Sequence, residues 1–222
     1  MTNDRRPLRS RDARLVQRLA VGLHRLGATP NAVSATSVVF ALLAASAFCL
    51  SGLVDSLSRA LLLALAAGGM GLRLLCNVLD GLLAVEHGRG SPTGPIWNEL
   101  PDRISDTLII VGAGYGAALM GAAWAAPLGW LAAVLALLTA YVRELGRGLG
   151  QPADYSGLGP KPIRMAILAI GALLGALEPL WAGRGEALGG AVVLTGLASA
   201  VTVFTRTRRL AQRLRRLEGP NS

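Results

Sequence analysis

Apolar and polar residues alternate in long blocks along this chain. Six apolar blocks approach or exceed the roughly 18 residues that a helix needs to cross a bilayer core of about 30 Å. They lie at about 33–53, 59–80, 104–121, 125–143, 164–181 and 187–204. The pattern predicts an all-α, polytopic membrane protein with six transmembrane helices.

The segment before the first block is polar and rich in arginine. Within residues 12–26, Leu15, Leu19, Leu23 and Leu26 share one helical face among the arginines. Such a basic amphipathic helix lies in the headgroup region, where anionic lipid attracts it. We therefore expect an N-terminal amphipathic juxtamembrane helix. The expected regions are a basic cytoplasmic segment, a six-helix membrane domain and a basic cytoplasmic tail, at 1–28, 29–205 and 206–222.

The formal net charge of +9 is distributed as the expected membrane topology requires, which argues against a nucleic-acid partner. Arginines crowd both termini, and the first, third and fifth connections hold only Arg59 and Arg184. By the positive-inside rule, both termini and the even-numbered connections face the cytoplasm. We expect a protein integral to the inner membrane, in contact with its lipids, with a cytoplasmic active site. The basic residues of the second and fourth connections are Arg89, Arg103, Arg143, Arg147, Lys161 and Arg164.

Polar residues at helical spacing join the second and third apolar blocks. Asn77 and Asp80 share one face of a helix, and Asn98, Asp102 and Asp106 follow four residues apart on the next. Acids near the end of a membrane helix are rarely kept unless they work or are paired. Two such faces meeting would surround a cation with carboxylate and amide oxygens, the ligands that Mg²⁺ and Mn²⁺ prefer.

An alternative is that these acids form ion pairs with Arg73, Arg89 or Arg103 near the membrane interface. A single acid would favour that interpretation. Three acids and two asparagines on two helical faces favour a functional site instead.

The polar region resembles the CDP-alcohol phosphotransferase (CDP-alcohol phosphatidyltransferase) family at fixed spacings. That family shares the pattern D-x2-D-G-x2-A-R-x8-G-x3-D-x3-D across its second and third membrane helices. The resemblance extends to the TPN sequence before the first helix, the six-helix layout and the basic connection between helices four and five. The eight pattern positions, aligned without a gap, are Asn77, Asp80, Gly81, Ala84, Val85, Gly94, Asn98 and Asp102.

This chain departs from the family pattern at three positions: Asn77 and Asn98 replace acids, and Val85 replaces arginine. The resemblance implies one or two divalent cations that hold the diphosphate of a CDP-linked lipid, and a general base at the last acid, Asp102. The implied metal ligands are Asn77, Asp80, Asn98 and Asp102, with Asp106 as an added candidate, and the residues that make room for the CDP moiety are Gly81, Ala84 and Gly94.

The lost acids predict weaker metal binding, because four carboxylates balance two divalent cations whereas Asp80 and Asp102 supply charge for one. Asp106, one turn further on, restores part of that charge. A second registration takes Asp102 and Asp106 as the D-x3-D pair. It requires a four-residue insertion and loses the glycine, so it ranks lower.

Basic residues downstream are candidates for binding the acceptor. Arg143 ends the fourth expected helix, and Lys161 and Arg164 begin the fifth. Family members use basic residues of these regions to bind the acceptor, often through its phosphate group. Ordinary positive-inside charge explains the same residues equally well.

The resemblance implies transfer of a phosphatidyl group from a CDP-linked lipid, such as CDP-diacylglycerol, to a small alcohol in phospholipid biosynthesis, with release of CMP. The missing acids favour an alternative: a catalytically impaired family member that serves as a lipid- or nucleotide-binding membrane partner. A transporter is disfavoured because the acids cluster at one interface. The family also implies a homodimer. No residue decides which alcohol accepts the group.

Overall fold

The computed structural model describes residues 14–85 and 92–217, and these residues form helices and no strand. The predicted all-α fold is therefore confirmed. Each predicted apolar block coincides with one long helix, α2 to α7. The elements are α1 (Arg14–Arg25), α2 (Pro30–Ser51), α3 (Ser56–Val85), α4 (Gly94–Met120), α5 (Ala125–Gly148), α6 (Lys161–Leu177), the 3-10 helix η2 (Glu178–Trp181) and α7 (Glu186–Leu217).

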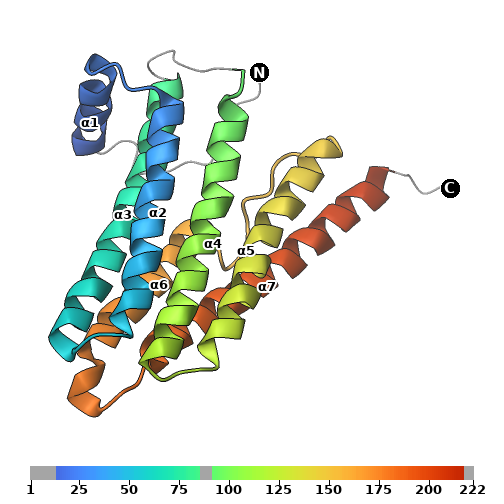
Figure 1. The fold of residues 1–222 in the computed structure, drawn as a ribbon. Helices are drawn as coiled ribbons and strands as arrows, with labels where there is room; N and C mark the ends of the chain where they lie inside the picture. The colour runs from blue at the N-terminus through green and yellow to red at the C-terminus, as the bar shows by residue number, and fades with distance from the viewer. Residues whose placement is uncertain (1–13, 86–91, 218–222) are drawn as a thin grey trace.

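The six long helices pack as a closed ring in the order α2, α3, α6, α7, α5 and α4, and α4 also contacts α7. In Figure 1, α2, α3 and α4 stand upright while α5 and α7 incline away from them. The starts of α2, α4 and α6 lie at the same end of the ring as the ends of α3, α5 and α7. Segments far apart in the sequence therefore meet at that end.

Polar caps fix where α2 and α3 begin. Thr29 is extended, as a residue before proline should be, and its side chain accepts a hydrogen bond from the Ala32 amide. Asp55 Oδ1 accepts from the amides of Leu57 and Ser58 at 3.0 and 3.2 Å. The hydrogen bonds from Ser58 lower the pKa of Asp55 below its ordinary value. The chain thus turns sharply between α2 and α3.

Glycines let α4 approach its neighbours closely. A Cβ on Gly112 would lie 2.7 Å from Ala45 Cα, and one on Gly116 would collide with the Phe48 carbonyl oxygen, so both face the backbone of α2. A Cβ on Gly114 would lie 2.9 Å from the Ala125 carbonyl oxygen, so this glycine faces the backbone of α5. These three glycines therefore allow α4 to pack closely against α2 and α5.

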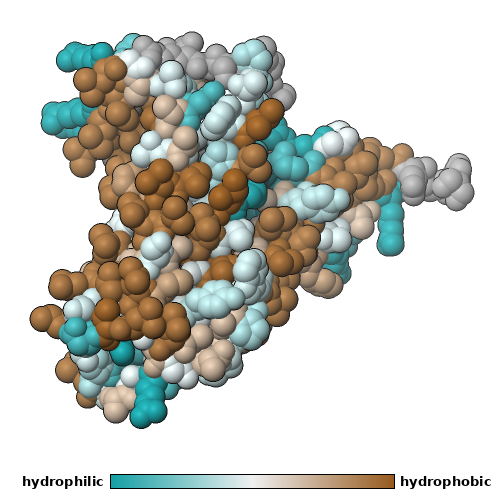
Figure 2. All heavy atoms as spheres, viewed as in Figure 1, coloured by the Kyte–Doolittle hydropathy of each residue, from teal (hydrophilic) through white to brown (hydrophobic). Residues whose placement is uncertain are grey.

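Five helices among the described residues are long and apolar enough to cross a membrane. Of the six long helices, α4 is outside this set because its first half carries charged residues. The count of six spans therefore stays a prediction. In Figure 2, apolar side chains cover much of the middle of the visible face, and hydrophilic residues lie toward the ends. Many large apolar side chains are exposed along these helices. Exposed apolar surface of this extent indicates an integral membrane protein. The five candidate spans are Pro30–Ser51, Ser56–Val85, Ala125–Gly148, Lys161–Trp181 and Glu186–Leu217.

The N-terminal helix α1 packs against α3. Ala20 is buried in this contact and Leu23 packs against the same apolar cluster, whereas Leu15, Leu19 and Leu26 are exposed. The leucine face expected from the sequence is therefore divided between contact with the protein and exposure. A role of α1 at the membrane surface stays a prediction.

Candidate active site

A fully buried arginine links the polar faces of α3 and α4. Arg73 Nη2 lies 2.7 Å from Asp106 Oδ1 and 3.3 Å from Asp102 Oδ1. The same nitrogen donates to the backbone carbonyl oxygen of Asp102 at 3.1 Å. Three oxygens of α4 therefore surround one nitrogen of Arg73.

Cationic side chains from the start of α6 reach the same two carboxylates. Lys161 Nζ lies 2.5 Å from Asp102 Oδ2, and Arg164 Nη2 lies 2.8 Å from Asp106 Oδ2. Asn77 Nδ2 donates to Asp102 Oδ1 at 2.6 Å. Both oxygens of Asp102 accept hydrogen bonds, whereas the buried Oδ1 of Asp106 has an ion-pair contact with Arg73 and no hydrogen bond among the described residues. Through these polar contacts α3, α4 and α6 meet.

Asp80 lies one turn beyond Asn77 on α3 and is 5% exposed. Its Oδ2 accepts a hydrogen bond from Ser34 Oγ at 2.6 Å, which ties α3 to the start of α2. Its Oδ1 is buried and has no hydrogen-bond partner among the described residues. A buried carboxylate oxygen without a donor is available to a cation.

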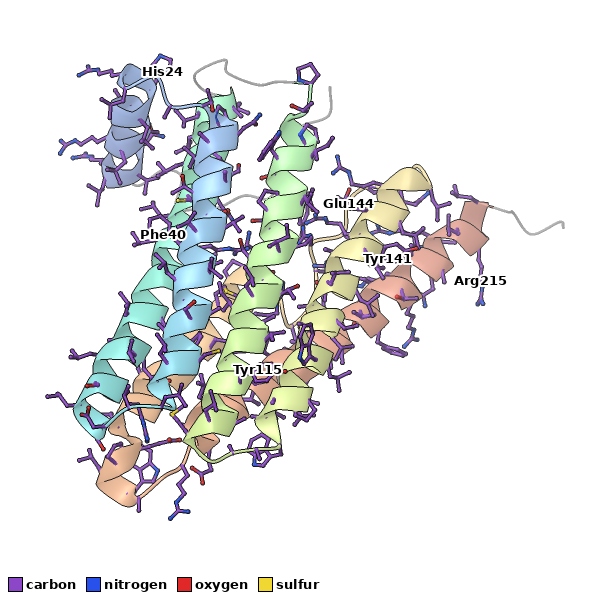
Figure 3. All side chains as sticks on the ribbon, viewed as in Figure 1. His24, Phe40, Tyr115, Tyr141, Glu144 and Arg215 are labelled. Atoms are coloured by element: carbon purple, nitrogen blue, oxygen red, sulfur yellow. The ribbon has the colours of Figure 1, made fainter. Side chains whose placement is uncertain are left out.

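Arg143 forms a separate ion-pair group at the end of α5. Its Nη2 lies 2.7 and 2.8 Å from the two carboxylate oxygens of Glu99, and its Nε donates to Glu144 at 2.8 Å. Arg103 pairs with Glu99 as well. Figure 3 places Glu144 near the upper end of α5. Arg143 therefore binds α5 to α4 without contacting Asp102 or Asp106.

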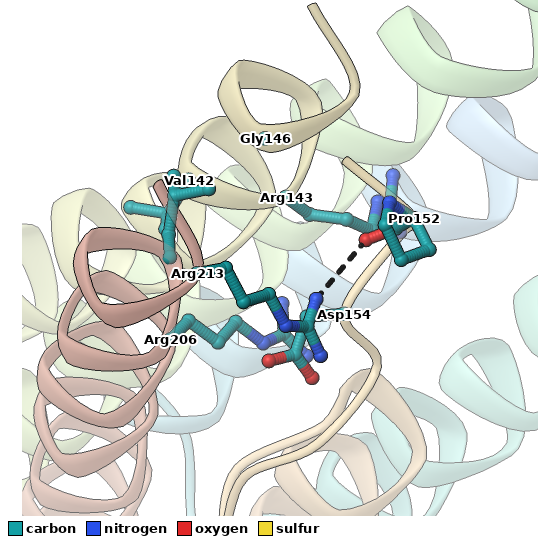
Figure 4. Close-up of a pocket in the computed structure, with 8 residues that line it drawn as sticks. Val142, Arg143, Gly146, Pro152, Asp154, Arg206 and Arg213 are labelled. Carbon is teal, nitrogen blue, oxygen red and sulfur yellow. Dashed lines mark hydrogen bonds between the residues drawn. The ribbon is translucent and has the colours of Figure 1, made fainter. Parts of the chain in front are cut away.

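A small pocket lies between the end of α5, the following connection and α7. Arg206 Nε donates to the Ser156 carbonyl oxygen at 2.8 Å, and Arg213 donates to the Pro152 carbonyl oxygen at 3.5 Å, the dashed line in Figure 4. Burial raises the pKa of Asp154, but hydrogen bonds from Ser156 outweigh it, so the pKa falls below its ordinary value. An ionised aspartate thus sits among these arginines. The lining residues are Val142, Arg143, Gly146, Pro152, Asp154, Arg206, Leu210 and Arg213.

The structure brings some of the expected site residues together and leaves others apart. Asn98 lies exposed on the first turns of α4, and Gly94 is half-buried where α4 begins. Gly81 and Ala84 are half-buried beside Asp80. The expected residues connected through direct contacts or through Arg73 are Asn77, Asp102, Asp106, Lys161 and Arg164.

Arg73 and Ser34 contact the site aspartates but are not among the residues expected from the sequence to bind metal or substrate. Arg73 had been considered as an ion-pair partner of the acids, and that pairing is confirmed. Its position four residues before Asn77, on the same helical face, was the available signal. Arg103 pairs with Glu99 instead, and Arg89 lies outside the described residues. Nothing in the local pattern linked Ser34 to Asp80, 46 residues away.

Comparison with known proteins finds relatives that match most of this chain. No family model matches it. A phosphatidylinositol phosphate synthase of Mycobacteroides abscessus is 28% identical over 207 residues, covering 87% of this chain and 82% of the relative. A bifunctional IPC transferase and DIPP synthase of Rubrobacter xylanophilus is 37% identical over 135 residues. That alignment covers 58% of this chain and 30% of the relative, so this chain spans under a third of it.

Solved structures share the fold. The phosphatidylinositol phosphate synthase of Mycobacterium tuberculosis with CDP-DAG bound superposes with a TM-score of 0.74 at 24% identity, covering 89% of this chain and 94% of that one. Its complex with manganese and citrate has a TM-score of 0.71 at 22% identity and covers 88% of each chain. These relatives support membership of the CDP-alcohol phosphatidyltransferase family.

The residues of this site fit one divalent cation better than two. Asp80 Oδ1 is a buried acceptor without a donor, which suits a hard cation. Asp102 and Asp106 are already paired with Arg73, Lys161 and Arg164. Among the described residues, no three His, Cys, Asp or Glu side chains are grouped so that they could hold a metal by themselves. A single ion would therefore complete its coordination with amide oxygens, waters and substrate phosphates.

Proposed function

We propose that this protein transfers a substituted phosphate group from a CDP-linked lipid to a small alcohol and releases CMP. The observation that carries the proposal is the junction of the two motif helices, where Asn77 of α3 contacts Asp102 of α4 at 2.6 Å. Asp80 lies one turn from Asn77 on the same face. Asn77, Asp80 and Asp102 of the motif therefore lie close to one polar junction at one end of the helix ring.

The proposed donor is CDP-diacylglycerol. The names of the relatives support a lipid donor of this class, since one solved relative was captured with CDP-DAG. Gly81, Ala84 and Gly94 would leave room for the cytidine nucleotide, because they add almost no side-chain bulk. The apolar surface of α2 to α7 would hold the acyl chains in the bilayer.

In the proposed reaction, Asp102 accepts the proton of the acceptor hydroxyl. The hydroxyl oxygen forms a bond to the lipid-side phosphorus of the diphosphate, and the bond from that phosphorus to the oxygen of CMP breaks. Asp102 becomes available as a base only when Lys161 moves from its Oδ2, where it lies at 2.5 Å. An anionic acceptor would draw Lys161 away at the moment when the base is needed.

The proposed cofactor is Mg²⁺ or Mn²⁺, and a relative solved with manganese supports a divalent ion. Asp80 would hold it, assisted by Asn77 and Asp102, with Asn98 and Asp106 as further candidates from the sequence. When bound, such an ion neutralises the diphosphate and stabilises charge on the departing CMP. The protein's part is to fix Asp80, through its hydrogen bond from Ser34, and to exclude water around it.

The proposed acceptor carries a phosphate or another anionic group. Lys161 is 18% exposed at its side chain and is the best placed cation beside Asp102. Arg143 lies on α5, where it forms an ion pair with Glu99 of α4. Arg164 is 2% exposed and donates to the Gly159 carbonyl oxygen at 2.6 Å, so its proposed part is to position Asp106 and the start of α6.

The proposed orientation places this end of the ring and both termini in the cytoplasm. The support is the charge distribution, since arginines concentrate in both terminal segments and in the even-numbered connections. CDP-linked lipids and phosphorylated alcohols would then approach from the cytoplasmic leaflet and the cytosol.

Binding without turnover is the second candidate function. The observation that favours it is the full engagement of Asp102, whose two oxygens contact Asn77, Arg73 and Lys161. A protein with this site would bind a CDP-linked lipid and release no CMP.

The deciding experiment measures CMP release from CDP-diacylglycerol by the purified full-length protein in detergent, with Mg²⁺ or Mn²⁺ and a panel of alcohols and phosphorylated alcohols. We expect release that requires metal, one acceptor and Asp102. Binding of the lipid nucleotide by folded protein, with no release for any acceptor, would instead establish the second candidate.

A further inference from the structure

We infer that Arg73 occupies the position of a second cation in this site, so that the protein needs one divalent ion and carries the other positive charge in its own chain. The inference rests on the proposed function and deepens it. It assigns Arg73 as a positioning residue that holds the two aspartates of α4.

The surroundings of Arg73 Nη2 resemble a cation site made of oxygens, whereas Nε and Nη1 are buried without a hydrogen-bond partner among the described residues. Its Nη2 lies 2.7 to 3.3 Å from Asp106 Oδ1, the Asp102 carbonyl oxygen and Asp102 Oδ1. Carboxylate and carbonyl oxygens that converge in this way are the ligands hard cations take. The guanidinium nitrogen therefore fills an oxygen-lined position between two turns of α4.

The charges of the cluster support the same conclusion. Asp80, Asp102 and Asp106 provide three carboxylates, and three buried or partly buried cations accompany them. A buried carboxylate needs a nearby positive charge, because the membrane protein interior solvates it poorly. With Arg73 in place, only the diphosphate of the donor lacks a counter-charge, and one divalent ion supplies it.

The two asparagines fit this arrangement. Asn77 uses its amide to donate to Asp102 at 2.6 Å, which an aspartate at that position could not do while ionised. An acid at position 77 would add a fourth negative charge, but a second divalent ion could bind there only if Arg73 were removed. The positive charge of Arg73 thus replaces the second cation that the lost motif acids would have bound.

The test counts Mn²⁺ ions bound by the full-length protein in detergent, without nucleotide, by paramagnetic resonance of the free ion. The wild-type protein and Asn77→Asp are expected to bind one ion per chain, since both keep Arg73. The double variant Arg73→Gln with Asn77→Asp is expected to bind two. The matched control, Arg103→Gln, removes an arginine next to Asp102 that pairs with Glu99, and it is expected to bind one.

Stability gives a second readout, which needs no active enzyme. Arg73→Gln leaves Lys161 on Asp102 and Arg164 on Asp106, so the variant is expected to fold with a lower melting temperature. Added Mn²⁺ should raise that temperature more in Arg73→Gln than in the wild type, because the ion replaces the lost charge. Arg73→Lys, which retains the charge, should show the smaller wild-type response.

Zero or two ions in the wild type, or equal Mn²⁺ responses in the wild type and Arg73→Gln, would overturn the inference. Its failure is distinct from failure of the proposed function. CMP release by a wild-type protein with two ions keeps the transferase and rejects the role of Arg73. One ion per chain without CMP release keeps the role of Arg73 in the charge cluster and rejects the transferase.

Discussion

The two ends of the helix ring both bury acidic side chains, but the partners of these acids differ in kind. Where α6 begins, Asp102 and Asp106 face the side chains of Arg73, Lys161 and Arg164. Where α6 ends, at the opposite end in Figure 1, Glu178 is fully buried. There its carboxylate accepts hydrogen bonds from backbone amides.

The amide donors at the far end belong to the start of α7. Glu178 Oε2 accepts from Gly185 N and Oε1 from Ala187 N, each at 2.6 Å. Backbone donors are fixed by the fold and cannot follow a ligand, so this carboxylate serves as a helix cap. Lysine and arginine side chains can change partners. The comparison teaches that burial of an acid marks function only where its partners are exchangeable.

The largest expected effect comes from Asp102. Asp102→Asn should reduce CMP release by about 100-fold or more, because a general base is lost. The measurement is the rate of CMP release from CDP-diacylglycerol at saturating metal. Glu178→Gln, at the other end, is the control and should keep a rate near that of the wild type. A comparable loss in both variants would contradict the distinction between the two ends.

The second largest effect is expected for Lys161, which is proposed to leave Asp102 and bind the acceptor. Lys161→Gln should raise the acceptor KM by about tenfold or more, since a hydrogen bond to a charged group contributes about 1.5–3 kcal/mol. The donor KM should change little. Steady-state kinetics with each substrate varied in turn make the measurement. Arg147→Gln, which removes an exposed arginine of α5, is the matched control. Equal effects of Lys161→Gln on the acceptor and donor KM values would contradict the proposed role of Lys161.

The helix cap predicts a change in stability alone. Glu178→Ala leaves the amides of Gly185 and Ala187 without their acceptor, which costs about 1–3 kcal/mol for each buried donor. Thermal unfolding in detergent should show the loss, and the KM values of the remaining folded protein should match the wild type. Glu186→Ala, at the exposed start of α7, should destabilise less. Altered KM values in Glu178→Ala would show that this end also serves the substrates.

The smallest effect concerns packing between the two ends. Gly116→Ala should lower stability by about 1–3 kcal/mol, because its Cβ collides with the carbonyl oxygen of Phe48 on α2. Gly68→Ala meets nothing within 4 Å and should keep or raise the melting temperature. If the two variants unfold together, the close contact of α4 with α2 does not limit stability.

The sequence predicted the fold well because apolar length and helical spacing are local properties. All six expected helices exist, although α4 and α7 extend well beyond their apolar blocks, to Gly94 and Leu217. Charged residues continue a helix as readily as apolar ones do. The hydropathy pattern therefore located these helices and misjudged their ends.

The candidate site was predicted in part. The two polar helical faces expected from the spacing meet where Asn77 contacts Asp102, and the roles of these residues stay predictions. The spacing did not predict that Arg143 would pair with Glu99 while Lys161 reached Asp102. Long basic side chains from different helices could pair with the same acids. Which of them forms the ion pair depends on distances that are set by helix packing.

The sequence by itself determined the helices, the family resemblance and the end of the molecule at which polar residues gather, because each follows from spacing along one chain. Only the tertiary structure decided the partners: Ser34 for Asp80, and Arg73 shared between Asp102 and Asp106. These contacts join α2 to α3 and α3 to α4. Their energies depend on distance and burial in three dimensions, to which the linear order of residues gives no direct access.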